Sequence, residues 1–170
     1  VIAVLDTGLD PSVPGLDKLP TGGPKIIEAR DFSGEGHVVM ARAEVDGEVL
    51  RQGDIVVRGV AAATVKPLRV GDYWLGAFDE AQIRNSAVED VDHNGRNNDR
   101  FAVLAFRRAP DGEEVMIIDT DGDGDLADER VRRSYAAEPQ WFTFGAGRDP
   151  KKNKAPLAIA ATSVLDDKRV

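Results

Sequence analysis

The fold is decided by residues 101–118, where Phe-Ala-Val-Leu-Ala-Phe is followed, after a short connection, by Glu-Val-Met-Ile-Ile. Both runs are short, apolar and rich in residue types that favour β-strands. Between them lies Ala109-Pro110-Asp111-Gly112. Proline presets φ in such a turn and glycine accepts a positive φ. The stretch therefore predicts an antiparallel β-hairpin.

The flanking sequence continues the β pattern. From 37 to 70, short runs rich in Val and Ala alternate with Asp-Gly and Gly-Asp pairs, which predicts a meander of short strands. A further strand is predicted at Tyr73 to Phe78, and 79–87 is predicted to form one or two helical turns. Because few other stretches have a helical pattern, we expect a mostly β (α+β) fold of short antiparallel strands.

Composition limits the classes of function. The 170 residues carry a net charge of −8 and no cysteine, so disulfides and thiolate metal sites are excluded. Nucleic acid is not an expected partner, because binding phosphates requires a basic surface. A membrane is not expected either, because no apolar run approaches the roughly 18 residues of a spanning helix. The chain begins within an apolar run, from which we expect a piece of a longer protein.

The amino-terminal stretch 1–8 reads Val-Ile-Ala-Val-Leu-Asp-Thr-Gly. An apolar run ended by turn residues predicts a buried strand, here with Asp6 at its carboxyl end. Open α/β sheets place their sites at that end of the strands. A carboxylate there can orient a histidine and stabilise its positive charge, although Asp6 can also be a plain turn acid. A loop rich in proline and glycine follows at 10–24, and Lys25 to Phe32 is predicted to be a second strand.

The stretch Val1 to Pro11 resembles the aspartate motif of the subtilisin-like serine proteases. Several later segments resemble the tripeptidyl-peptidase II branch of that family, which carries a long insertion between its aspartate and histidine motifs. These segments are 10–16, 24–36, the hairpin with 118–126, Tyr135, 142–145 and 157–165. The resemblance implies that Asp6 is the catalytic aspartate of an Asp-His-Ser triad.

The same resemblance implies two domains. Residues 1–24 would be an amino-terminal piece of the catalytic domain, namely the first strand of a truncated subtilisin-like α/β domain. Residues 25–170 would be a β-rich insertion domain attached to it. In the intact protein the insertion would restrict access of peptide or protein substrates or mediate oligomerisation. We expect the insertion to be the folded part.

The family's histidine and serine motifs are absent from the sequence. His37 and His93 lack the Gly-His-Gly-Thr-His setting, and Ser163 lacks the glycine of Gly-Thr-Ser-Met-Ala. We therefore expect the chain to stop before the histidine motif and to be inactive as a peptidase by itself, because the triad acts as a unit.

A second constellation of residues has the spacing of a calcium loop. Oxygen ligands at positions 1, 3 and 5 with glycine at position 6 suit Ca²⁺, which takes 6–8 oxygens. Position 12, usually glutamate, is Arg130 here, so that Asp128 or Glu129 would have to replace it. The candidate ligands are Asp119, Asp121, Asp123, Asp125, Asp128 and Glu129.

A weaker version of the pattern precedes the hairpin, with Asp90, Asp92, Asn94 and Asp99 as candidate ligands. The two loops lie at the same end of the predicted hairpin, so we expect them to be neighbours. Both are also explained as solvated turns, since Asp, Asn and Gly favour turns without any metal. If Asp6 is incidental, the alternative function is a non-catalytic, calcium-binding β module for binding or interaction.

Overall fold

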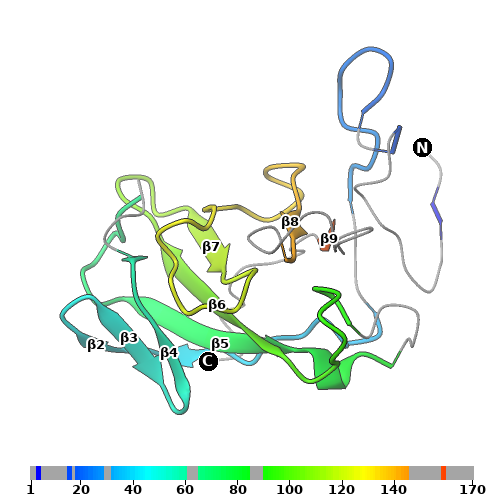
Figure 1. The fold of residues 1–170 in the computed structure, drawn as a ribbon. Helices are drawn as coiled ribbons and strands as arrows, with labels where there is room; N and C mark the ends of the chain where they lie inside the picture. The colour runs from blue at the N-terminus through cyan, green and yellow to red at the C-terminus, as the bar shows by residue number, and fades with distance from the viewer. Residues whose placement is uncertain are drawn as a thin grey trace.

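The computed structural model describes residues 3–4, 15–16, 18–28, 32–60, 65–84, 90–145 and 158–159. These residues form a mostly β structure, and the predicted fold class is confirmed (Figure 1). Within the described residues, no helix is long and apolar enough to cross a membrane.

The central sheet contains the predicted hairpin. Its strands are ordered β1-β5-β6-β7 and each pairs antiparallel with its neighbour. The bounds are β1 Ala41–Arg42, β5 Tyr73–Asp79, β6 Arg100–Arg107 and β7 Glu114–Ile118. Leu104 of β6 lies opposite Leu75 on one side and Ile117 on the other. The turn closes where Gly112 donates its N–H to the carbonyl of Arg108 at 2.8 Å.

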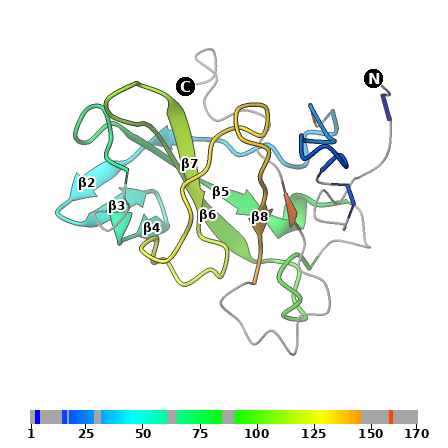
Figure 2. The same ribbon diagram turned by 90° about the horizontal axis from the view of Figure 1, so that it is seen from above.

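The predicted meander forms a second, smaller antiparallel sheet with the order β2-β3-β4. Its strands are β2 Glu44–Asp46, β3 Val49–Gln52 and β4 Ile55–Val57. Figure 2 shows this sheet beside β5 and β6. The two sheets share an apolar core, in which Leu50 and Val57 pack with Leu75, Leu104 and Ile117.

Both faces of β6 are covered, which explains its continuous apolar sequence. Leu104 and Phe106 face the small sheet, whereas Val103 and Ala105 belong to a second core cluster on the opposite face. That opposite face also holds Phe144, whose ring lies 4.7 Å from the ring of Phe101, measured between centroids. Phe144 follows β8, Phe142–Thr143, which pairs with β9, Ala158–Ile159. Alternate side chains of a strand point to opposite faces, so a strand covered on both sides must be apolar throughout.

The predicted helical turns at 79–87 are present as a single 3-10 turn, η2, Glu80–Gln82. It is capped by Asp79, whose carboxylate accepts the N–H of Ala81 at 2.9 Å. The remainder of that prediction, 85–89, lies outside the described residues.

The predicted strand at Lys25 to Phe32 is wrong for its described part. Residues 25–28 are not part of a strand, and Ile27 is 61 % and Phe32 84 % exposed. The apolar pattern there was real, but a strand also requires a neighbour to accept its backbone hydrogen bonds. Of the predicted first strand, only Ala3 and Val4 are described. Both are exposed, and neither is part of a sheet. Asp6 and the rest of that strand lie outside the described residues, as does most of the predicted strand Leu157 to Val164.

Candidate functional site

The two acidic loops flank the hairpin formed by β6 and β7. The first loop ends at Asp99, directly before β6, and the second begins at Asp119, directly after β7. Asp119 donates its N–H to the carbonyl of Ala102 at 2.9 Å, which holds the second loop against the start of β6. The loops therefore lie at the same end of the hairpin, as predicted. Their acidic side chains nevertheless form two separate groups among the described residues, one on each loop.

The group on the second loop consists of Asp119, Asp121 and Glu129. One carboxylate oxygen from each lies within 4.8 Å of the others. Asp119 is buried at 3 % exposure, and Asp121 and Glu129 are half-buried. Three carboxylates this close repel one another, and a divalent cation between them relieves that repulsion. Hard oxygen donors of this kind suit Ca²⁺.

Asp119 organises the backbone of this loop. Its Oδ1 accepts the N–H groups of Gly122 at 2.8 Å and Asp123 at 3.2 Å, and its Oδ2 accepts that of Gly124 at 3.0 Å. Glu129 closes the loop from the other end, because its Oε1 accepts both the N–H and the hydroxyl of Thr120. The carboxylates of the loop thus stabilise its fold through hydrogen bonds. These bonds are compatible with both interpretations of the loop, a solvated turn and a calcium site.

The small sheet fixes the outer side of the loop. Arg58, directly after β4, donates its N–H to Gly124 at 3.0 Å and accepts the N–H of Leu126 at 2.9 Å. Leu126 is buried in the core between the sheets. Gly59 has φ +83°, and a Cβ there would stand 2.2 Å from Oδ1 of Asp125, so only glycine fits. The loop is therefore anchored to both sheets.

Burial raises the pKa of Asp119 and of Glu129 above their usual values. Hydrogen bonds from Gly122, Gly124 and Thr120 work in the opposite direction, but burial is the larger effect. The negative charge of Asp121 contributes to the rise in both pKa values. A bound cation would favour the charged form of these carboxylates.

The other candidate ligands of this loop lie outside the group. Asp123 is exposed and accepts the N–H of Asp125 at 2.7 Å. Asp125 accepts the N–H of Ala127 and pairs with Arg58. Asp128 is exposed. Of the two acids that could replace position 12, it is therefore Glu129 that joins Asp119 and Asp121.

The group on the first loop contains a residue that sequence reasoning missed. Glu80 of η2 lies with Asp90 and Asp92, again with oxygens within 4.8 Å. Glu80 is 1 % exposed, and its two oxygens accept the N–H groups of Val91 at 2.8 Å and Asp99 at 2.9 Å. It therefore clamps both ends of the loop. Burial raises its pKa, with a further contribution from Asp99 and Asp92.

Further hydrogen bonds link side chains of the first loop to one another and to its backbone. Asp90 accepts the N–H groups of Asn94 and Gly95, and Asn94 donates from its side-chain amide to Asp92 and Asp99. By donating to two carboxylates, the amide of Asn94 stabilises their negative charges, as a bound cation would. These hydrogen bonds of Asn94 favour the turn interpretation of the first loop.

No catalytic triad is assembled within the described residues. His37 is exposed, on a turn in which its N–H donates to Gly34, and His93 is exposed on the first acidic loop. Asp6 and Ser163 lie outside the described part. The structure thus neither joins nor separates the candidate triad residues.

In the described part, the second acidic loop links two antiparallel β-sheets, and sequence comparisons relate the chain to subtilisin-like serine peptidases. It is 30% identical over 147 residues to pyrolysin from Pyrococcus furiosus, covering 76% of this chain and 10% of pyrolysin. It is 35% identical over 75 residues to tripeptidyl-peptidase 2 from Caenorhabditis elegans, covering 44% of this chain and 5% of that protein. The Arabidopsis thaliana tripeptidyl-peptidase 2 is 31% identical over 91 residues, covering 52% and 6%.

These relatives confirm the resemblance to subtilisin-like peptidases of the tripeptidyl-peptidase II type. The chain spans about a tenth or less of their lengths, so it corresponds to one segment of such a protein. No family model matches the chain, and no solved structure matches it.

Proposed function

We propose that this chain is a segment of a subtilisin-like serine peptidase and that Asp6 is the aspartate of its triad. The observation that carries the proposal is the 30% identity to pyrolysin over 76% of the chain. In the triad, serine attacks the scissile carbonyl and histidine takes and returns its proton. The aspartate holds the histidine in the correct tautomer and stabilises its positive charge. Peptides or proteins are the substrates that this chemistry implies.

The chain by itself is inactive under this proposal, because it carries neither of the family's other two motifs. Incubation of the 170-residue chain with a fluorophosphonate probe, which labels activated serines, tests this. No labelling is expected, and the Ser163→Ala variant should behave identically. Covalent labelling that disappears in Ser163→Ala would contradict the proposal, because it would mean that the chain activates its own serine.

The role of Asp6 is tested in the complete parent protein. Asp6→Asn should lower kcat on the order of 10⁴-fold, the effect of losing this acid in such a triad. Asp17→Asn, in the adjacent sequence rich in proline and glycine, is the matched control and should leave kcat unchanged. Equal activity of both variants would remove Asp6 from the triad.

We propose the domain boundary at residues 24 and 25, with 25–170 forming the insertion. The exposed turns at 18–28 support a connecting role for that segment. Limited proteolysis of the 170-residue chain should yield a protected core that retains both sheets and begins after residue 24. Cleavage first within 41–118 would contradict this domain organisation.

A second function, calcium binding by the 119–129 loop, is favoured by a separate observation. Asp119, Asp121 and Glu129 present three oxygens within 4.8 Å of one another, two of them on carboxyl groups whose pKa values burial raises. Ca²⁺ would serve as a structural ion there. Calorimetric titration should detect saturable calcium binding with a weaker response to Mg²⁺, which requires a tighter octahedral site. Absence of heat at about 1 mM Ca²⁺, in the range of weak extracellular sites, would exclude the ion.

A further inference from the structure

A pocket of about 520 Å³ lies beside Glu129, and no part of the proposed peptidase chemistry uses it. It is bounded by β7 and by the segment that follows the second acidic loop. Its charged lining is dominated by arginine: Arg108, Arg130, Arg132 and Arg133, with Glu129 and Glu138. Val65, Val115 and Val131 supply an apolar part of the wall.

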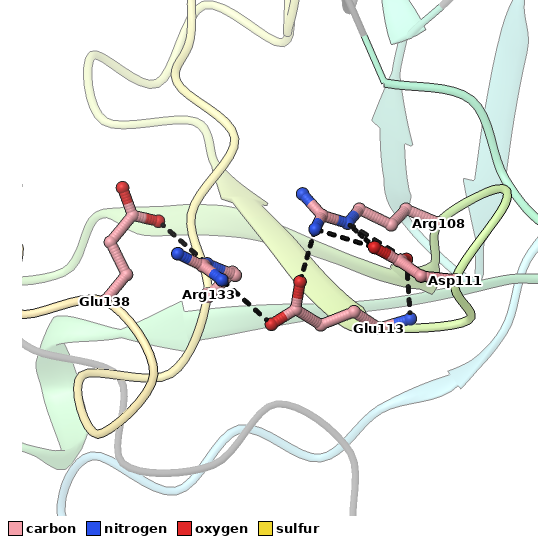
Figure 3. Close-up of polar contacts among 5 residues, drawn as sticks. All are labelled: Arg108, Asp111, Glu113, Arg133 and Glu138. Carbon is pink, nitrogen blue, oxygen red and sulfur yellow. Dashed lines mark hydrogen bonds and ion pairs between the residues drawn. The ribbon is translucent and has the colours of Figure 1, made fainter.

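Two of the four arginines are already neutralised by an alternating chain of charges (Figure 3). Arg108 pairs with Asp111 at 2.8 Å and with Glu113. Glu113 also pairs with Arg133 at 3.1 Å, and Arg133 donates to Glu138 at 3.4 Å. Because each of these two guanidinium groups is paired with two carboxylates, Arg108 and Arg133 form a fixed wall of the pocket and are not free to bind a ligand.

The other two arginines have no such partners among the described residues. The Nε of Arg132 is buried and receives no hydrogen-bond acceptor there. Its backbone is fixed, because it exchanges hydrogen bonds with Met116 of β7 at 2.8 and 2.9 Å. Burial lowers the pKa of Arg132; the negative charge of Glu138 raises this pKa, and the positive charge of Arg130 lowers it. A buried N–H group without an acceptor is costly, and an anion that accepts a hydrogen bond from Nε of Arg132 would offset that cost.

We propose that this pocket binds a carboxylate group of a peptide through Arg130 and Arg132. The planar guanidinium fork matches the two oxygens of a carboxylate. A monoanion suits the site better than a phosphate dianion, because Glu129 and Glu138 also line the pocket and repel negative charge. The valines of the wall accommodate the apolar parts of the residues beside the carboxylate.

Two sources of that carboxylate are possible, a glutamate side chain and a peptide carboxyl terminus. Titration of the ¹⁵N-labelled 170-residue chain with acetyl-Ala-Glu-Ala-amide and with acetyl-Ala-Ala-Ala carrying a free carboxyl end distinguishes them. The neutral control is acetyl-Ala-Gln-Ala-amide. The backbone amides of Val131 and Arg132 should shift with at least one carboxylate peptide, saturating in the millimolar range at low salt, where screening is weakest.

Variants then assign the binding to the two arginines. Arg130 is exposed, so Arg130→Gln should fold normally and weaken carboxylate binding about tenfold, equivalent to about 1.4 kcal/mol. Arg132→Gln should weaken it at least as much. The matched control is Arg51→Gln on β3, which makes the same charge change on an exposed strand and should leave the affinity unchanged.

Saturable binding of a carboxylate peptide that Arg130→Gln weakens and Arg51→Gln does not would support the proposal. Equal binding of the neutral peptide would overturn it, as would equal loss in Arg51→Gln. Binding of inorganic phosphate without binding of either carboxylate peptide would also overturn it, because the site would then recognise a different anion.

Discussion

Glu129→Gln should change the stability of the domain in opposite directions with and without calcium. The substitution removes one negative charge from the group of Asp119, Asp121 and Glu129 but keeps an acceptor oxygen for Thr120. Glutamine has nearly the same size, so the loop geometry can persist. The variant therefore isolates the charge of Glu129 from its hydrogen bonds.

The magnitudes follow from the geometry. Two unit charges within 4.8 Å repel by about 1–3 kcal/mol, depending on how well water screens them. Weaker hydrogen bonds to Thr120 offset part of that gain, since bonds to a charged acceptor are roughly twice as strong. Without calcium, the variant should be more stable than the natural chain by up to about 1 kcal/mol. With calcium at about 100 times its Kd, the natural chain gains about 2.7 kcal/mol and the variant gains little.

Thermal unfolding followed by circular dichroism measures both effects. For a chain of 170 residues, the calcium-dependent rise in Tm should be about 5–10 °C for the natural protein. Glu129→Gln should show a slightly higher Tm in EDTA and almost no rise with calcium. Asp128→Asn is the matched control, because Asp128 is exposed in the same loop and outside the group. If Asp128→Asn loses the calcium response while Glu129→Gln keeps it, the assignment of ligands from this geometry is refuted.

Three further predictions concern the same structure. In EDTA, the free energy of unfolding should rise as the pH falls from 7 toward about 5. Glu80, Asp119 and Glu129 have raised pKa values, so the folded state binds more protons than the unfolded state. Urea unfolding at both pH values measures this, and a fall in stability would contradict it. Leu104→Ala, at a fully buried position of β6, should lower the free energy of unfolding by about 2–5 kcal/mol in urea titrations, and a loss below about 1 kcal/mol would mean that the core is not packed as described. Gly59→Ala should destabilise the domain more than Gly47→Ala and weaken its calcium response. Both glycines have positive φ, but only Gly59 faces Asp125 without space for a Cβ. Equal losses of stability would show that the contact with Asp125 is unimportant.

The local parts of the fold were predictable from sequence, and the parts that depend on distant partners were not. The hairpin at 101–118 was found because proline, glycine and two apolar runs specify it within 18 residues. The strand expected at Lys25 to Phe32 had a similar composition, but its described residues do not form a strand. Composition reports what a segment can bury, whereas pairing decides whether it becomes a strand.

The candidate metal site illustrates the same limit. The spacing of Asp119 and Asp121 predicted two of the three grouped carboxylates, because ligands two residues apart on a tight turn are local. It left Asp128 and Glu129 open, since that choice depends on the backbone between them. Glu80 could not be found at all. Its contacts with Val91 and Asp99 arise only because β5 and β6 pair with Asp79 opposite Arg100.

The position of the second acidic loop determines what a bound cation would do. The loop leaves β7 of the central sheet at Asp119, and Arg58 of the small sheet holds it at Gly124 and Leu126. An ion at Asp119, Asp121 and Glu129 would therefore strengthen the joint between the two sheets. It would not create the fold, because Leu50, Leu104 and the other core residues between the sheets are buried without it. The calcium-free chain should accordingly remain folded, in contrast to small domains whose metal supplies most of their stability.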